Sequence, residues 1–344
     1  MKTNAGIGFF RMYEFVHLCN MNLESFGYSE NLEKARTEQG YTDFVPGRVV
    51  AQHRDRYLVI TESGELEAEI TGNMRFQASG REDLPAVGDW VALTVFEGSL
   101  AIVHHIFPRI SLLSRLAAGS KTDRQVIASN VDVALLVQAL DRDFNPNRLE
   151  RYLTLCYSAG IEPVVVLTKT DLIPADKLQS VTSMLRQRIP NLTLVSVSSQ
   201  TGEGWHDLES LFRKGLTYCM LGSSGAGKST LMNRLCGKEI MKTLEISENT
   251  GKGKHTTTHR ELILLPNGSL LIDNPGMREV GLADAGDGLE SAFYEIHQLA
   301  EHCRYRDCTH TLEADCAVVE AVTTGKLGRQ AYENYLKIQK ENAH

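Results

Sequence analysis

The sequence has no apolar run as long as the roughly 18 residues that a membrane-spanning helix needs. Its longest apolar stretches, Val131–Val137 and Pro163–Leu167, are short and rich in valine and leucine, as buried strands are. Near the N-terminus charged residues interrupt the apolar ones and no small-residue cleavage site follows, so no signal peptide is predicted; Met12 or Met21 is an alternative start. These absences predict a cytoplasmic protein that does not bind a membrane.

The sequence also lacks the paired cysteines of a disulfide-stabilised fold. Its cysteine count, seven, is odd, and the first four cysteines are scattered among apolar residues. They are Cys19, Cys156, Cys219 and Cys236. Isolated cysteines in apolar surroundings are typical of buried core thiols, so no disulfide framework is predicted.

An excess of positive charge is absent too, because 36 Lys and Arg residues stand against 43 Asp and Glu residues, a formal net charge of −7. Such a balance does not predict an overall positive surface that would attract nucleic acid. Any RNA partner must therefore be bound by local basic clusters. One candidate cluster is Arg109, Arg115, Lys121 and Arg124, and the other is Lys252, Lys254 and Arg260.

The 344 residues, of which 42% are hydrophobic and 23% charged, are those of a globular protein with several domains. Residues 1–44 are polar with little periodicity and are predicted to form a mobile N-terminal extension. Residues 45–108 contain five short strand patterns separated by turn signals, which favours an oligonucleotide/oligosaccharide-binding (OB) barrel, although an SH3-like barrel gives a similar pattern. The predicted strands are Arg48–His53, Tyr57–Thr61, Glu65–Ile70, Trp90–Val95 and Leu100–Ile106.

Residues 109–284 alternate strand and helix patterns, which predicts a mainly parallel α/β sheet covered by helices. The predicted strands are Val131–Gln138, Pro163–Leu167, Leu192–Val197, Leu216–Leu221, Glu261–Leu265 and Ser269–Ile272. A hairpin signal, Pro266-Asn267-Gly268, separates the last two, so that pair is predicted to be antiparallel. Residues 285–344 are predicted to be mainly helical and end in a helix, Gly328–Lys340, whose apolar stripe indicates packing.

The strongest motif is a phosphate-binding loop, G-x-x-x-x-G-K-[ST], between an apolar strand and a helix. It comprises Gly222, Ser223, Ser224, Gly225, Ala226, Gly227, Lys228 and Ser229, with Thr230 following in the helix. The glycines let backbone N–H groups point at phosphate oxygens at the helix N-terminus. Lys228 is expected to reach the β- and γ-phosphates, and the Ser229 hydroxyl to bind Mg²⁺.

Two further motifs predict guanine over adenine. Thr168-Lys169-Thr170-Asp171 resembles the base-specificity motif of GTPases, usually Asn-Lys-x-Asp. The Asp171 carboxylate is expected to accept two hydrogen bonds from guanine that adenine cannot donate, and a site built for such bonds discriminates strongly. Because Thr168 replaces the asparagine, the side-chain amide that braces this loop is expected to be missing. Ser198 and Ser199 follow the next strand, where GTPases place the loop that contacts the guanine oxygen.

The γ-phosphate end of the site is predicted from two other segments. In a D-x-x-G motif, Asp273 is expected to hold Mg²⁺ through water and the Gly276 N–H to sense the γ-phosphate. Thr257, in the glycine-rich basic stretch 251–258, is expected to complete the Mg²⁺ shell. Many GTPases orient the attacking water with a glutamine at the position that Met277 occupies here. Because Met277 cannot hydrogen-bond this water, His255 is the candidate for that role. The alternative is that His255 is a loop histidine that contacts solvent or RNA phosphate. The predicted catalytic residues are Lys228, His255 and Thr257.

The order of these motifs is permuted. Ordinary GTPases begin with the phosphate loop, whereas here the base motif and the serine loop precede it and Asp273 comes last. The same sheet results if the chain is cut after the strand of Asp273 and rejoined through Gly215. The sequence therefore predicts a circularly permuted GTPase domain.

A metal-binding pattern, C-x₄-C-x-H-x₅-C, lies near the C-terminus. Its members are Cys303, Cys308, His310 and Cys316. Three thiolates and one imidazole are the ligand set of a closed, structural zinc site. Charged neighbours that a core would exclude argue against a chance cluster of buried thiols. One structural Zn²⁺ per chain is predicted, in addition to Mg²⁺ bound with GTP.

The succession of barrel, permuted GTPase domain and cysteine/histidine module resembles the circularly permuted ribosome small-subunit-dependent GTPases, the RsgA (YjeQ) family. The resemblance spans about 45–340 and includes Pro46-Gly47-Arg48 and Val87-Gly88-Asp89-Trp90. It implies a cytoplasmic GTP phosphohydrolase that binds GTP and GDP, the small (30S) ribosomal subunit and its 16S rRNA. It further implies a role in late subunit maturation, with hydrolysis stimulated by the subunit. A monomer is expected.

Three other functions fit parts of the sequence. An ATP-dependent kinase or transporter subunit would share the phosphate loop, but Asp171 and the serine loop argue against it. An RNA-binding scaffold with a relic nucleotide site would not require Lys228 and Asp273. A tRNA-modifying or translocating GTPase would carry its own effector domains, which the sequence does not indicate.

Overall fold

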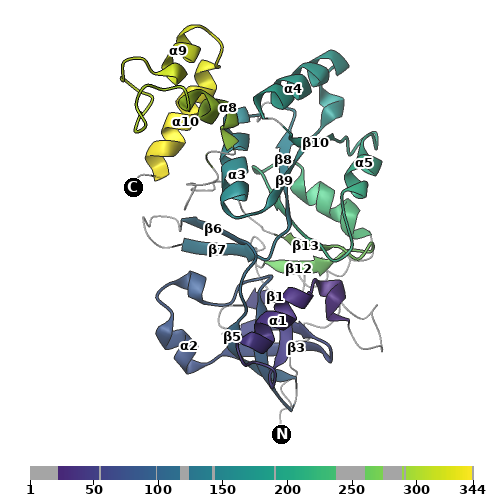
Figure 1. Ribbon diagram of the computed structural model, residues 1–344. Coiled ribbons are helices and arrows are strands. Elements are labelled where there is room, and N and C mark those ends of the chain that lie inside the picture. The colour runs from purple at the N-terminus through teal and green to yellow at the C-terminus, as the bar shows by residue number, and fades with distance from the viewer. Residues whose placement is uncertain are drawn as a thin grey trace, which may run out of the picture.

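The computed structural model describes residues 22–53, 56–97, 99–116, 124–141, 144–189, 191–237, 260–273, 289 and 292–342. Figure 1 shows three parts along the molecule: a β-barrel, a sheet flanked by helices, and a helical C-terminal module at the end opposite the barrel. Among the described residues, no helix is both long and apolar enough to cross a membrane.

Five strands form the barrel. They are β1 (Val45–His53), β2 (Arg56–Thr61), β3 (Gly64–Ile70), β4 (Trp90–Phe96) and β5 (Leu100–Ile106). Their order is β1-β2-β3-β5-β4, and β4 pairs back onto β1, which closes the barrel around a core of small and branched apolar side chains. A short helix, α2 (Gly72–Gln77), and a 3₁₀ turn, η2 (Arg81–Asp83), connect β3 to β4. The five-stranded closed order confirms the OB-type barrel.

The segment before the barrel is folded where the structure describes it. It contains a 3₁₀ turn, η1 (Leu23–Phe26), and α1 (Glu30–Glu38), which Ser29 caps by accepting a hydrogen bond from the Leu32 N–H. Leu23, Phe26 and Leu32 are buried in the main core cluster. The prediction of a mobile extension is therefore wrong for residues 22–44, because a few well-spaced apolar residues suffice to anchor an otherwise polar segment.

The central sheet has six strands in the order β10-β9-β8-β11-β13-β12. They are β8 (Val133–Ala139), β9 (Glu162–Thr168), β10 (Thr193–Ser196), β11 (Thr217–Leu221), β12 (Glu261–Leu264) and β13 (Leu270–Asp273). All neighbours are parallel except β12 and β13, which form the predicted antiparallel hairpin. The accompanying helices are α3 (Pro146–Ser158), α4 (Ala175–Arg188), α5 (Trp205–Ser210) and a helix over 228–237. A short 3₁₀ turn, η3 (Thr170–Leu172), follows β9.

A two-stranded hairpin between barrel and sheet was not predicted. It consists of β6 (Leu112–Leu116) and β7 (Arg124–Ser129), with Leu113 opposite Ala128. Each strand carries only a short apolar stretch among polar residues, so its pattern alone does not distinguish it from a connecting loop.

Barrel and central sheet are continuous rather than separate. β1 pairs antiparallel with β12, with Ala51 opposite Glu261. Beside this junction the Arg48 guanidinium is buried and donates hydrogen bonds to the carbonyls of Phe26, Gly88 and Asn130 and to the Thr217 hydroxyl. Burial lowers the pKa of Arg48 to about 10, while Asp132 and Asp89 act to raise it. One side chain thus ties together the N-terminal segment, the barrel and the sheet.

The C-terminal module contains α8 (Tyr294–Ala300), α9 (Ala317–Thr323) and α10 (Arg329–Asn342). Tyr335 and Ile338 of α10 are buried, so the apolar stripe packs as predicted. A buried polar contact fixes α10 to α3: the Asn334 amide donates to the Glu150 carboxylate over 2.7 Å, and Arg188 pairs with the same carboxylate. Glu150 is only 2% exposed; burial raises its pKa, and Arg188 and Asn334 act to lower it.

Candidate nucleotide and metal sites

The motif-bearing loops meet at one edge of the central sheet. β9, β10, β11 and β13 are parallel and lead into the base motif, the serine loop, the phosphate loop and Asp273, respectively. Carboxyl ends of parallel strands share an edge, where ligands of such sheets bind. Gly222 opens the phosphate loop, and only glycine fits there, because a Cβ would lie 2.4 Å from the Val137 carbonyl oxygen.

Thr168 connects the base motif directly to the phosphate loop. Its buried hydroxyl donates a hydrogen bond to the Ala226 carbonyl over 2.6 Å. It also lies against Gly227, where a Cβ would be 3.4 Å from the Thr168 hydroxyl oxygen. The amide of the usual asparagine is missing, as the sequence states, and the Thr168 hydroxyl provides a side-chain contact between the two loops. A hydroxyl takes the place of the amide.

The base motif is also held to the serine loop. The Ser198 hydroxyl donates to the Asp171 carboxylate over 2.6 Å and accepts from the N–H groups of Gln200 and Thr201. Ser198 is buried, whereas Asp171 and Ser199 are exposed at the sheet edge. A fixed hydroxyl therefore orients a carboxylate that remains accessible to a base.

Lys169 has a partner that the sequence did not indicate. Its ammonium forms a 2.6 Å ion pair with Asp141, which lies just beyond the end of β8. Lys169 adopts a left-handed backbone conformation with φ of 58°, which is uncommon for a residue with a side chain and often marks a functional loop. Thr170, by contrast, is buried beneath the loop. The only signal in the sequence for this partner is that Asp141 is an acidic residue shortly after a predicted strand, at the edge of the sheet that carries the motif loops.

Lys228 and Asp273 lie within electrostatic reach of one another. The Lys228 ammonium donates to the carbonyls of Gly222 and Ser223, each over 2.6 Å. Burial lowers the pKa of Lys228, and the Asp273 carboxylate acts to raise it. Ser229 and Thr230 are exposed in the first turn of the helix over 228–237. Of the remaining predicted residues, His255, Thr257 and Gly276 lie outside the described residues.

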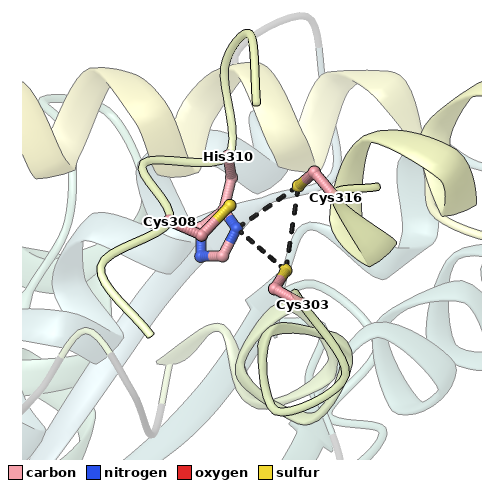
Figure 2. Close-up of side chains that lie close together, drawn as sticks. All are labelled: Cys303, Cys308, His310 and Cys316. Carbon is pink, nitrogen blue, oxygen red and sulfur yellow. Dashed lines mark hydrogen bonds between the residues drawn. The ribbon is translucent and has the colours of Figure 1, made fainter. Parts of the chain in front are cut away.

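The four metal-ligating candidates converge in the C-terminal module, and their possible ligand atoms all lie within 4.8 Å of one another. Figure 2 shows Cys303, His310 and Cys316 in mutual contact: His310 Nδ1 is 3.5 Å from each of the two Sγ atoms, and these are 3.8 Å apart. Burial lowers the pKa of His310, which favours the neutral imidazole that binds metals. This cluster could hold a metal ion.

The loops around the cluster are fixed independently. Tyr332 of α10 donates its hydroxyl to the His310 carbonyl over 2.6 Å. Glu313 accepts hydrogen bonds from the N–H groups of Thr309 and Thr311, and Arg304 pairs with Asp315. Cys316 caps α9 by accepting from the Val319 N–H. The cysteines are therefore presented by an ordered scaffold.

Comparison with known proteins identifies the family. A protein-family model described as RsgA GTPase matches residues 106–283 of this chain. The small ribosomal subunit biogenesis GTPase RsgA 2 of Lactiplantibacillus plantarum is 41% identical over 326 residues, 94% of this chain and 90% of that protein. RsgA 1 of Bacteroides thetaiotaomicron is 41% identical over 329 residues, 94% and 91% of the two chains. The chain belongs to the RsgA GTPase family.

Solved structures agree with this assignment. YjeQ from Thermotoga maritima superposes with a TM-score of 0.61 at 26% identity, covering 87% of this chain and 98% of that chain. YloQ, a circularly permuted GTPase, shares the fold with a TM-score of 0.63 at 23% identity, covering 88% and 96% of the two chains. The predicted family, fold class and GTPase activity are confirmed.

The predicted basic clusters are only partly available to an RNA. Arg109 is bound by the fully buried Asp89, with distances of 2.8 and 2.6 Å, and donates to the carbonyls of Glu82 and Leu84. It therefore clamps the barrel, and its contact with an RNA stays a prediction. The Arg115 side chain and Lys121, Lys252 and Lys254 lie outside what the structure describes.

Proposed function

We propose that this RsgA-family GTPase binds GTP and GDP through the sheet edge that carries the four motif loops. The observation that carries the proposal is the pair of hydrogen bonds from Thr168 to the phosphate loop and from Ser198 to Asp171. They hold the elements for phosphate and base recognition at a fixed separation. Asp171 selects guanine, the loop over 222–229 binds the phosphates, and Ser229, Thr257 and Asp273 hold Mg²⁺.

We further propose that the chain acts in the cytoplasm, as a monomer, on the small ribosomal subunit and its 16S rRNA in late maturation. The support is the name of its relatives, which are small ribosomal subunit biogenesis GTPases at 41% identity over nearly the whole chain. Met277 cannot orient water, so hydrolysis should be slow until the subunit stimulates it.

The decisive experiment measures GTP hydrolysis with and without purified small subunits. Adding subunits is expected to raise the hydrolysis rate at least about tenfold. This is equivalent to lowering the activation free energy of hydrolysis by roughly 1.4 kcal/mol. The Lys228→Ala variant should stay inactive under both conditions, which excludes a contaminating GTPase. An equal rate with and without subunits would contradict the proposed role.

The group that positions the attacking water can be tested in the same assay. We propose His255 for this role, since it lies two residues before Thr257. His255→Ala should abolish the stimulated rate and leave GTP affinity nearly unchanged. Full stimulation of this variant would show that another residue or the ribosomal RNA positions the water.

We propose that the Cys/His cluster holds one structural zinc ion. A tetrahedral site with Zn–S near 2.3 Å and Zn–N near 2.05 Å places sulfurs about 3.8 Å apart and sulfur and nitrogen about 3.6 Å apart. The distances among Cys303, His310 and Cys316, 3.8 and 3.5 Å, fit this geometry, and Cys308 lies within 4.8 Å of the other ligand atoms. With four protein ligands no coordination position is left for catalysis, so the metal stabilises the module.

A further inference from the structure

The carboxyl end of β8 belongs to the nucleotide edge of the sheet, although no motif marks it. In the strand order β8 lies between β9, which leads into the base motif, and β11, which leads into the phosphate loop. Neighbouring strands are about 4.8 Å apart, so a ligand that bridges these two loops passes over the end of β8. The residues that follow β8 are therefore placed to act on the base site.

Strand register brings Asp141 to the base motif. The Leu140 N–H donates to the Thr168 carbonyl over 2.9 Å, so the pairing of β8 with β9 continues to the last residues of the two strands. Asp141 and Lys169 come next along the two segments, and their side chains form the 2.6 Å ion pair. Leu140 is buried, which fixes the backbone just before Asp141. The ion pair is thus a consequence of how two central strands are aligned.

The base motif contains a second carboxylate that could attract the same ammonium. Asp171 follows Lys169 by two residues, so their Cα atoms are at most about 7 Å apart. Lysine carries its ammonium on a flexible four-carbon stem, which can cover such a distance. An ion pair between these two side chains would occupy the carboxylate oxygens that guanine is proposed to use. An ammonium without another partner would therefore compete with guanine for Asp171.

The structure shows the two carboxylates in different roles. The Lys169 ammonium pairs with Asp141, whereas Asp171 accepts a hydrogen bond from the Ser198 hydroxyl over 2.6 Å. Lys169 has a left-handed backbone with φ of 58°, a conformation that persists in a residue with a side chain only where the surroundings hold it. Asp141 thus holds the cation of the base motif, and Ser198 orients its anion.

We infer that Asp141 is a positioning residue for guanine recognition. By binding the Lys169 ammonium it keeps this charge from Asp171 and leaves the Asp171 carboxylate for the base. Asp141 acts through Lys169, and the inference rests on the proposed role of Asp171. The side chains of Lys169 and Asp141 are 36% and 29% exposed, so water and salt screen their contact and a moderate effect is expected.

The test measures the affinities of GDP and ADP by competition with a fluorescent GDP analogue. Asp141→Asn keeps the size of the side chain and removes its charge. GDP should bind about three- to fivefold more weakly, the range of a partly exposed ion pair. ADP affinity should stay the same, because adenine does not donate the pair of hydrogen bonds that Asp171 accepts. The loss for GDP should shrink in about 1 M salt, where the screening length falls to roughly 3 Å.

A second substitution separates this role from a role in the fold of the loop. Lys169→Met removes the ammonium and keeps an unbranched side chain. In this background Asp141→Asn should weaken GDP binding no further, because no charge is left to compete for Asp171. Asp141→Glu, which keeps a carboxylate, should retain most of the GDP affinity. A residue that only shaped the loop would give the same loss with and without the ammonium.

The matched control is Asp207→Asn, which removes the same charge from an exposed position of α5. A GDP affinity of Asp141→Asn equal to that of this control would overturn the inference. Proportional losses for GDP and ADP, or a loss that persists beside Lys169→Met, would overturn it too. An unaltered chain that binds ADP as well as GDP would contradict the proposed function and the inference together. A preference for GDP that Asp141→Asn keeps in full contradicts the inference alone.

Discussion

Residues far apart in the sequence form the nucleotide site, whereas one short segment supplies the whole Cys/His cluster. Thr168 and Ala226, which are hydrogen-bonded, are 58 residues apart, while Cys303 and Cys316 are separated by 13. The first site is supported by strands buried on both faces, such as β8 and β11. The second lies among loops with little regular structure. We therefore expect the first site to keep its shape without its ligand, and the proposed zinc to add to the local hydrogen bonds that hold the loops of the second.

The largest expected effect follows from removing a metal ligand. Cys316→Ser should reduce the zinc content from about one per chain to near zero and unfold the loops of the module, because structural zinc contributes about 10 kcal/mol or more. GTP affinity should change little, since the sheet edge is built independently. Elemental analysis and nucleotide titration measure the two outcomes.

The buried thiol Cys156, in α3, provides the control for this change. Cys156→Ala should retain zinc, although it creates a small cavity. Loss of GTP binding together with zinc in Cys316→Ser, but not in Cys156→Ala, would show that the two sites are not independent.

The next largest effect is expected at the base-recognition carboxylate. Asp171→Asn should weaken GTP binding by about 10⁴-fold, because a site built to accept hydrogen bonds is left with mismatched groups. Xanthine nucleotides, which present the complementary pattern, should bind better than guanine nucleotides. Competition titrations with GTP, XTP and ATP measure the preference.

Asp176→Asn, in the first turn of α4, serves as the matched control because it removes the same charge five residues away. It should leave the preference for guanine intact. A preference for guanine that persists in Asp171→Asn would remove the assignment.

A smaller effect is expected at the contact between the two regions. Asn334→Ala removes the hydrogen bond to the buried Glu150 carboxylate and should cost about 1.5–3 kcal/mol, as bonds to charged groups do. The loss should appear in the unfolding of the C-terminal module by chemical denaturation. Lys337→Ala, at an exposed position of the same helix, should be nearly neutral. Equal stability of the two variants would mean that α10 is held by apolar packing alone.

The smallest effect is expected at the brace inside the nucleotide site. Thr168→Ala leaves the Ala226 carbonyl without its side-chain donor and should cost about 1–2 kcal/mol, a roughly five- to thirtyfold loss of GTP affinity. Thr168→Ser keeps the hydroxyl and should restore most of the affinity. Equal affinities of the alanine and serine variants would show that the hydrogen bond does not support binding.

Much of the architecture could be predicted because the relevant signals are local. Strand periodicity located all eleven strands of the barrel and central sheet to within a few residues, and the order of motifs gave the permutation. The hairpin β6–β7 and the anchoring of residues 22–44 were missed, since their apolar residues are too few to form a pattern. Domain boundaries and the roles of the individual site residues stay predictions.

The sequence by itself determined the candidate chemistry: a phosphate-loop motif, a carboxylate predicted to select guanine, and a set of three cysteines and one histidine, each defined by residues at fixed short spacing. Only the tertiary structure decided how these groups are held. It turned Arg109 inward to Asp89, gave Thr168 a carbonyl partner in another loop, and paired Lys169 with Asp141. Such contacts join segments tens of residues apart, and their geometry arises from strand order and packing, which no local pattern of residues encodes.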